Sequence, residues 1–94
     1  MRKLGITSLY VLAIIQNYPG DAFGGGIEGH LARATQYDEM PPGQTSLILR
    51  RLKTRKLLRV RKTPRVPERG KQRIYYALTR EGDKTLDEIR RFIQ

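Results

Sequence analysis

The fold is decided by the segment Arg73-Ile74-Tyr75-Tyr76-Ala77-Leu78-Thr79-Arg80-Glu81-Gly82. Ile74, Tyr76 and Leu78 alternate with other residues, which is the period of a strand that buries one of its faces. Thr79 follows directly, and a threonine hydroxyl can accept hydrogen bonds from the free N–H groups at the start of a helix. The segment therefore predicts a strand over residues 73–78 that leads into a last helix. The apolar positions of that helix are Leu86, Ile89 and Ile93.

A second strand precedes this segment. Leu58-Arg59-Val60-Arg61-Lys62 alternates apolar and basic residues, which again indicates a half-buried strand. Residues 63–72 hold two prolines and Gly70 and predict a loop. The two strands thus form a β-hairpin. Tyr75 faces away from Tyr76, and its role stays open between packing and stacking on a nucleic-acid base.

Three helices are expected before the hairpin. Thr7 or Ser8 caps the first, which ends at Tyr18-Pro19-Gly20-Asp21 because proline and glycine do not continue a helix. The second covers about residues 22–35, where each of four glycines lowers the helix propensity by up to about 1 kcal/mol. Its start is therefore open between loop and helix.

The third helix begins near Pro42-Gly43 and ends near Arg55, with Leu49 and Leu52 facing inward. The resulting order is three helices, a β-hairpin and a closing helix. This order predicts a winged helix-turn-helix, an α+β fold that is mainly α. The second and third helices form the helix-turn-helix pair, and the hairpin is the wing.

Length and composition favour a single domain over residues 1–94, because a 38% hydrophobic content can bury one modest core. The chain has no cysteine, which excludes disulfides and fits a reducing cytoplasm. The apolar run Leu9-Tyr10-Val11-Leu12-Ala13-Ile14-Ile15 follows basic residues but is too short to span a bilayer, which takes about 20 residues. We therefore expect a cytoplasmic chain, associated with the nucleoid, that has no membrane partner.

Positive charge is concentrated on one stretch of the chain. The formal net charge is +10, and residues 50–73 hold 12 of the 19 basic residues against the single acidic residue Glu68. Lysines and arginines set against phosphates release condensed counterions, and an arginine can also fork onto a guanine edge. The stretch predicts double-stranded DNA as a partner, with a solvated basic face as the alternative.

The candidate DNA-binding residues come from the third helix and the wing. Gln44 suits an adenine edge, and Arg51 suits a guanine or a phosphate. The wing would lie along the backbone or enter a minor groove, or it would be a disordered basic loop that orders on contact. The candidates are Gln44, Thr45, Ser46, Ile48, Arg50, Arg51 and Arg55 on the helix, and Lys62, Arg65, Arg69, Lys71 and Arg73 on the wing.

Two segments resemble the PadR family of transcriptional regulators. Residues 42–52, followed by Leu57-Leu58, are similar to the family's Pro-Gly-Thr-Leu-Tyr, then Leu-x-Arg-Leu, then a Leu-Leu/Val pair. Residues 70–82 resemble its basic-Tyr-Tyr-x-Leu-Thr-x-x-Gly pattern. The resemblance implies a winged helix that binds DNA and regulates transcription. The sequence departs from the pattern at Thr45-Ser46, at Lys56, where glycine is usual, and at Gly25, where an aromatic is usual.

Both terminal helices have more apolar residues than one helix face needs, which predicts a twofold homodimer. The candidate dimerisation residues are Tyr10, Val11, Ile14, Ile89, Phe92 and Ile93.

No catalytic, metal or cofactor pattern is apparent in the sequence. His30 is the only histidine, Gly24-Gly25-Gly26 is not followed by Gly-Lys-Ser/Thr, and the acidic pairs are adjacent rather than opposed. We expect no enzyme activity, no metal and no cofactor, and the sequence leaves open whether a small-molecule effector exists. A transcriptional regulator, in particular a repressor, is the leading function. The alternatives are a partition or architectural protein that coats repeated DNA sites, and a winged-helix module for RNA or protein.

Overall fold

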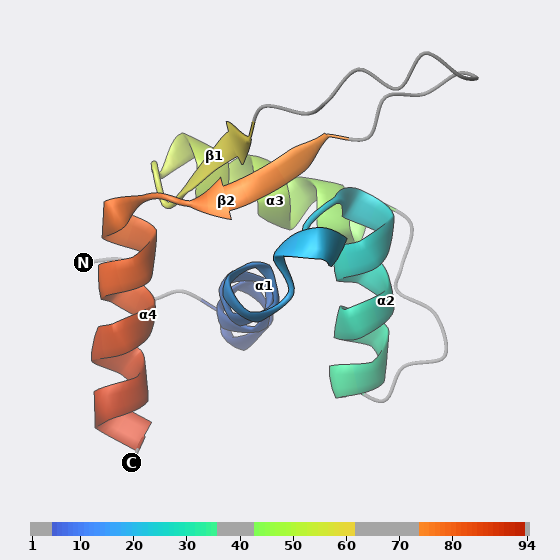
Figure 1. Ribbon diagram of the computed structural model, residues 1–94. Coiled ribbons are helices and arrows are strands. Elements are labelled where there is room, and N and C mark those ends of the chain that lie inside the picture. Colours follow the sequence, from blue (N-terminus) through green and yellow to red (C-terminus); the bar gives the residue numbers. More distant parts are fainter. Residues whose placement is uncertain (1–4, 36–42, 62–73, 94) are drawn as a thin grey trace.

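The structure is a computed structural model of the chain, and it describes residues 5–35, 43–61 and 74–93. Figure 1 shows the arrangement of its elements. Within these ranges, four α-helices and a two-stranded antiparallel sheet confirm the predicted winged helix-turn-helix. None of the helices in the described ranges has the length and apolar character needed to cross a membrane. The elements are α1 (Ile6–Asn17), the 3-10 turn η1 (Pro19–Asp21), α2 (Gly24–Thr35), α3 (Gln44–Thr54), β1 (Leu58–Arg61), β2 (Tyr75–Leu78) and α4 (Arg80–Ile93).

Helix α1 lies at the centre of the molecule. It runs between α2 and α4 in Figure 1, and it also packs against α3 and β2. Neighbours on several sides bury Val11, Leu12, Ile14 and Ile15. The prediction that Val11 and Ile14 are available to a second subunit is therefore wrong, because a central helix buries apolar residues on more than one face.

The first helix also begins earlier than predicted. It starts at Ile6 with Gly5 as the N-cap, and no side-chain hydrogen bond caps it. The Leu9 N–H donates to the Gly5 carbonyl oxygen at 3.2 Å, which closes the first turn through the backbone alone. Thr7 and Ser8 lie inside the helix rather than at its cap.

The glycine-rich stretch that left the start of the second helix open is helical from Gly24 onward, and only residues 22–23 of the predicted helix lie outside it. Residues Pro19–Asp21 form η1, and α2 begins only at Gly24. A Cβ atom on Gly26 would collide with the carbonyl oxygen of Asp21. The missing side chain thus allows α2 to pack closely against η1.

The sheet pairs β1 with β2 from Leu58↔Leu78 to Arg61↔Tyr75. On its other side β2 forms a single bridge, Phe23↔Tyr75, and the Tyr76 N–H donates to the Ala22 carbonyl oxygen at 2.8 Å. Tyr76 and Leu78 pack against the core as predicted. Ile74 differs, because it precedes β2 beyond the edge of the core and is 53% exposed.

Thr79 caps α4 as predicted. Its Oγ1 accepts a 3.0 Å hydrogen bond from the Gly82 N–H, and its carbonyl oxygen accepts one of 3.0 Å from Asp83. One face of α4 then closes the core through Leu86. The buried apolar core consists of Val11, Leu12, Ile14, Ile15, Ala22, Ile27, Leu31, Ile48, Leu49, Leu52, Leu58 and Leu86.

Candidate nucleic-acid interface

Helix α3 buries one stripe of residues and exposes the opposite face. Thr45, Ile48, Leu49 and Leu52 are buried, and their i, i+3, i+4, i+7 spacing is that of a helix with one apolar side. The helix starts after Gly43, whose φ of 79° is in the left-handed region that favours glycine. This start sets the stripe toward α1 and α2, which both contact α3.

Two predicted DNA contacts are wrong because they belong to the buried stripe. Thr45 is 6% exposed and Ile48 is 4% exposed. Leu49 and Leu52 point inward as predicted. The buried side of the helix also includes Thr45 and Ile48, so its centre is rotated from the predicted direction toward these two residues. The Thr45 Oγ1 has no hydrogen-bond partner in the part of the chain that the structure describes.

The outward face of α3 is centred on Leu47, Arg50 and Thr54. An α-helix turns by about 100° per residue, so these three positions lie opposite the buried stripe. All three are exposed, as are Gln44 and Arg51 on one flank and Ser46 and Lys53 on the other. The prediction missed Leu47 and Thr54. If Ile48 is taken as an inward-facing residue together with Leu49 and Leu52, the predicted outward face moves onto Leu47 and Thr54.

The end of α3 is a tight turn that directs the chain into β1. The Leu57 N–H donates to the Leu52 carbonyl oxygen at 3.0 Å, and the Lys56 N–H donates to the Lys53 carbonyl oxygen at 3.0 Å. These two bonds define a Schellman motif, in which the residue just after the C-cap usually is a glycine in the left-handed region. Lys56 takes that place with a φ of 62°.

The positive charge of the described residues is concentrated on α3, the turn and β1. Residues 43–61 hold seven basic residues and no acidic one, whereas α4 holds four of each sign. Residues 5–35 hold Arg33 against Asp21 and Glu28. The seven basic residues are Arg50, Arg51, Lys53, Arg55, Lys56, Arg59 and Arg61. An anion approaching α3 therefore meets positive charge that no neighbouring carboxylate in this segment offsets.

Arg61, one of these seven residues, contacts groups of its own chain. Arg61 Nη2 donates a 3.0 Å hydrogen bond to the Pro19 carbonyl oxygen. Its guanidinium also lies 5.0 Å from the centre of the Tyr75 ring, which in turn meets the Phe23 ring edge-on at 5.3 Å. Tyr75 is half-buried and packs between Arg61 of β1 and Phe23.

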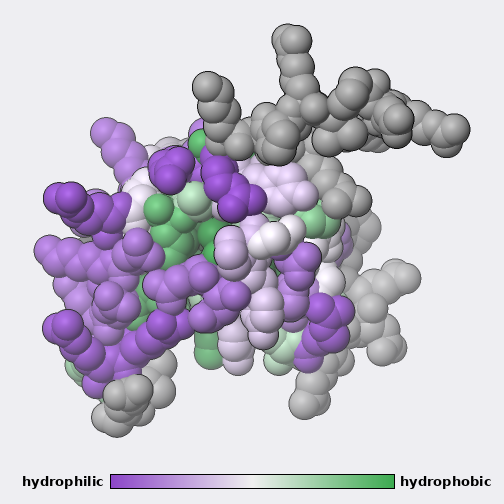
Figure 2. Space-filling model, viewed as in Figure 1, coloured by the Kyte–Doolittle hydropathy of each residue, from purple (hydrophilic) through white to green (hydrophobic). Residues whose placement is uncertain are grey.

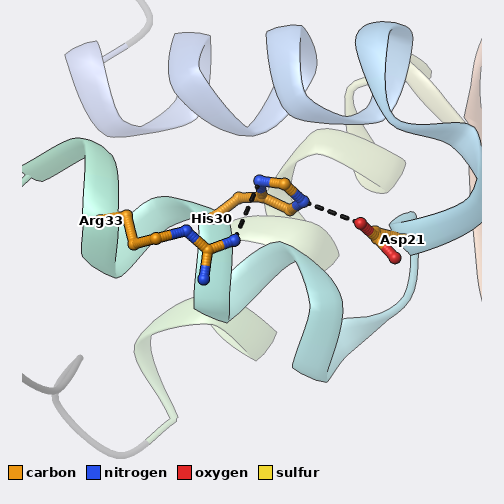
Figure 3. Close-up of polar contacts among 3 residues, drawn as sticks. All are labelled: Asp21, His30 and Arg33. Atoms are coloured by element: carbon orange, nitrogen blue, oxygen red, sulfur yellow. Dashed lines mark hydrogen bonds and ion pairs between the residues drawn. The ribbon is translucent and has the colours of Figure 1, made fainter.

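A polar cluster fixes α2 against η1 (Figure 3). His30 Nε2 lies 2.9 Å from Asp21 Oδ2, and Arg33 Nη2 lies 3.3 Å from His30 Nδ1. A guanidinium can only donate, so Nδ1 accepts and Nε2 carries the proton donated to Asp21. The Tyr18 ring stacks on the imidazole at 4.2 Å. These contacts join His30 of α2 to Asp21 of η1. The described ranges contain no group of three or more metal-ligating side chains.

The remaining candidates divide into those that can be placed and those that cannot. Lys62, Arg65, Arg69, Lys71 and Arg73 lie outside the described residues. Among the dimerisation candidates, Tyr10 is 38% exposed, Phe92 is 93% exposed and Ile89 is half-buried. Ile93 is the last residue of α4. Figure 2 shows hydrophilic side chains over α4 and hydrophobic side chains between α4 and α1.

Comparison with solved structures supports the predicted resemblance. The fold is similar to the crystal structure of a PadR family transcription regulator from hypervirulent Clostridium difficile R20291, with a TM-score of 0.72. The two chains are 24% identical, and the match covers 95% of this chain and 91% of that one. The PadR resemblance is thus confirmed at the level of the fold. No protein-family model matches the sequence, and a search of curated proteins gave no significant match.

Proposed function

We propose that this chain binds double-stranded DNA in a sequence-specific manner and regulates transcription. The observation that carries the proposal is the outward face of α3, where exposed Arg50 and Arg51 stand in a segment with seven basic residues and no acidic one. In a helix-turn-helix the second helix of the pair enters the major groove and its side chains reach base edges. The likeness to a transcription regulator is a second, independent support.

The exposed residues of α3 have the chemistry for both base reading and phosphate binding. We assign Arg50 and Arg51 to guanine edges or phosphates, and Gln44 to an adenine edge, because these side chains match those hydrogen-bond patterns. Ser46 and Arg55 complete the set on the helix, and we add Arg59, which is exposed on β1, as a phosphate contact. The basic wing residues of the predicted set would contact the backbone or a minor groove.

The proposal includes a homodimer, in which each chain forms a single domain. Phe92 is 93% exposed, and Tyr10 is 38% exposed on the helix that packs beside α4. We assign Tyr10, Ile89, Phe92 and Ile93 to a twofold interface that covers these apolar side chains. A twofold dimer sets two recognition helices about one DNA turn, or roughly 34 Å, apart and binds a palindrome.

In this account the dimer acts on the nucleoid in the cytoplasm, as a repressor that occupies an operator and blocks polymerase. The proposal contains no catalytic step, no metal and no cofactor. Nothing in the described residues favours the partition, architectural, RNA-binding or protein-binding alternatives over this reading. They remain the outcomes against which it is tested.

Selection from a random 30-base-pair duplex library, followed by genome-wide mapping of bound sites, tests the proposal. We expect one enriched palindrome with half-sites about one turn apart, found singly near promoters. Long arrays of a repeated site would instead indicate a partition protein. A parallel selection from an RNA hairpin library that yields an enriched sequence, together with no enrichment from the duplex DNA library, would contradict DNA regulation altogether.

A further inference from the structure

We infer that Leu47 reads the C5-methyl group of a thymine in the major groove, which would make it a specificity-determining residue of α3. The inference rests on the proposed DNA binding and deepens it. It begins from an exposed apolar residue on a helix whose other aliphatic residues are buried. Leu47 is 39% exposed, whereas the adjacent Ile48 and Leu49 are each 4% exposed.

The position of Leu47 distinguishes it from an ordinary surface leucine. Single exposed apolar residues are common on proteins and by themselves mean little. Leu47, however, lies at the centre of the outward face of α3, and positions three and four apart on a helix are neighbours. Those neighbours are Gln44 on one side and Arg50 and Arg51 on the other, all exposed. An apolar side chain is thus framed by three side chains that can bind base edges.

The chemistry of the major groove selects the ligand of this leucine. The thymine C5-methyl is the apolar group that the base pairs present in that groove, where the remaining edge groups are hydrogen-bond donors and acceptors. A leucine pressed against one of those polar groups would remove it from water without replacing its hydrogen bond. Thymine is therefore the base that Leu47 accepts with a gain in affinity.

The surrounding charge favours DNA over a protein partner at this face. Segment 43–61 holds no acidic residue, so a protein surface covering Leu47 would have to supply every counter-charge for its arginines. Duplex DNA supplies phosphates on both sides of the groove that holds the methyl group.

The experiment starts from the duplex that the wild-type chain selects from a random library. Each thymine is replaced in turn by deoxyuridine, which lacks only the C5-methyl and keeps the hydrogen-bonding edge. Fluorescence anisotropy then gives the Kd of the wild type, Leu47→Ala and Leu47→Met on each duplex. Ile6→Ala serves as the matched control, because Ile6 is 69% exposed on α1.

We expect at least one deoxyuridine to weaken wild-type binding by about fourfold per methyl group in contact. Leu47→Ala should bind the thymine and uracil duplexes equally, while Leu47→Met and Ile6→Ala should keep the wild-type ratio. The alanine substitution lies on an exposed helix position, so we expect the fold to be retained.

Two results would overturn the inference while leaving sequence-specific binding intact. In one, no deoxyuridine changes wild-type affinity. In the other, Leu47→Ala retains the full thymine preference. If that variant also weakens self-association, Leu47 belongs to a protein interface instead. If the selection yields no consensus duplex, the proposed function itself fails, and this inference fails with it.

Discussion

The Thr79 hydroxyl donates a 2.6 Å hydrogen bond to the carbonyl oxygen of Lys56, 23 residues earlier in the chain. The Thr79 side-chain oxygen, Oγ1, also accepts the 3.0 Å bond from the Gly82 N–H that caps α4. Beside it, the Thr79 N–H donates to the Leu57 carbonyl oxygen at 3.1 Å. One residue therefore joins the turn after α3 to the first turn of α4. These hydrogen bonds position the end of α3 and the start of the wing relative to α4.

We expect Thr79→Val to destabilise the protein by about 1–2 kcal/mol, since it removes a helix cap and leaves the Lys56 carbonyl without its side-chain donor. Thr79→Ser keeps the hydroxyl and should cost less than half as much. Urea unfolding followed by circular dichroism measures both values. A loss in Thr79→Ser that equals or exceeds the loss in Thr79→Val would contradict this prediction, because serine lacks only the methyl group whereas valine lacks the hydroxyl.

Lys56→Gly should stabilise the protein by about 0.5–1 kcal/mol, because glycine adopts positive φ without the steric cost that a Cβ atom imposes. The matched control is Lys53→Gly, inside the same helix, which should destabilise by about 1 kcal/mol. Thermal unfolding of the two variants should show melting temperatures that move in opposite directions. A loss of stability in Lys56→Gly would show that the lysine side chain makes a contribution larger than the strain.

The glycines of α2 should respond in opposite ways to alanine. Gly26→Ala places a Cβ against the Asp21 carbonyl and should cost about 1–3 kcal/mol through overpacking. Gly29→Ala places its Cβ 3.7 Å from Arg33 Nη1, an ordinary contact, and should gain about 0.5–1 kcal/mol of helix propensity. Chemical denaturation of both variants checks the pair. A stabilised Gly26→Ala would contradict the close approach of α2 to η1.

Phe92→Glu should break the proposed dimer and leave the monomer folded, because Phe92 makes little contact within its own chain at 93% exposure. Sedimentation at tens of micromolar should show a dimer for the wild type and a monomer for the variant, with unchanged circular dichroism. Lys84→Glu, also exposed on α4, controls for the introduced charge. A monomeric wild type would remove both the dimer and the expected palindrome.

The parts of the fold that depend on local signals could be read from the sequence. The cap at Thr79 and the inward packing of Tyr76 and Leu78 depend on close neighbours, and the structure places them as predicted. The strict alternation does not hold, because all four residues of β2 are half-buried and Ile74 is exposed. The role of α1 could not be read in this way, because sequence periodicity does not reveal how many elements surround a helix. Val11 and Ile14 are buried for that reason.

The positive charge of the candidate site could be predicted from the sequence, but the face of α3 that is exposed could not. The basic run of α3 is visible in the sequence, whereas the face it presents depends on which apolar residues form the buried stripe. Two leucines define a direction only loosely, and Thr45 is polar, so its burial depends on packing with neighbours. The bond between Arg61 and Pro19 joins residues 42 positions apart, beyond the reach of any spacing rule.

The central claim is that the outward face of α3 reads duplex DNA, and a competition measurement tests it most directly. A labelled copy of the selected duplex is titrated with the wild type, Arg50→Ala, Arg51→Ala and the α4 control Lys84→Ala, against unlabelled selected and random duplexes. The wild type should prefer the selected duplex. At least one α3 variant should lose about 1–3 kcal/mol on it and much less on the random duplex, while Lys84→Ala should match the wild type. Equal wild-type affinity for both duplexes, or an undiminished preference in both arginine variants, would contradict the account.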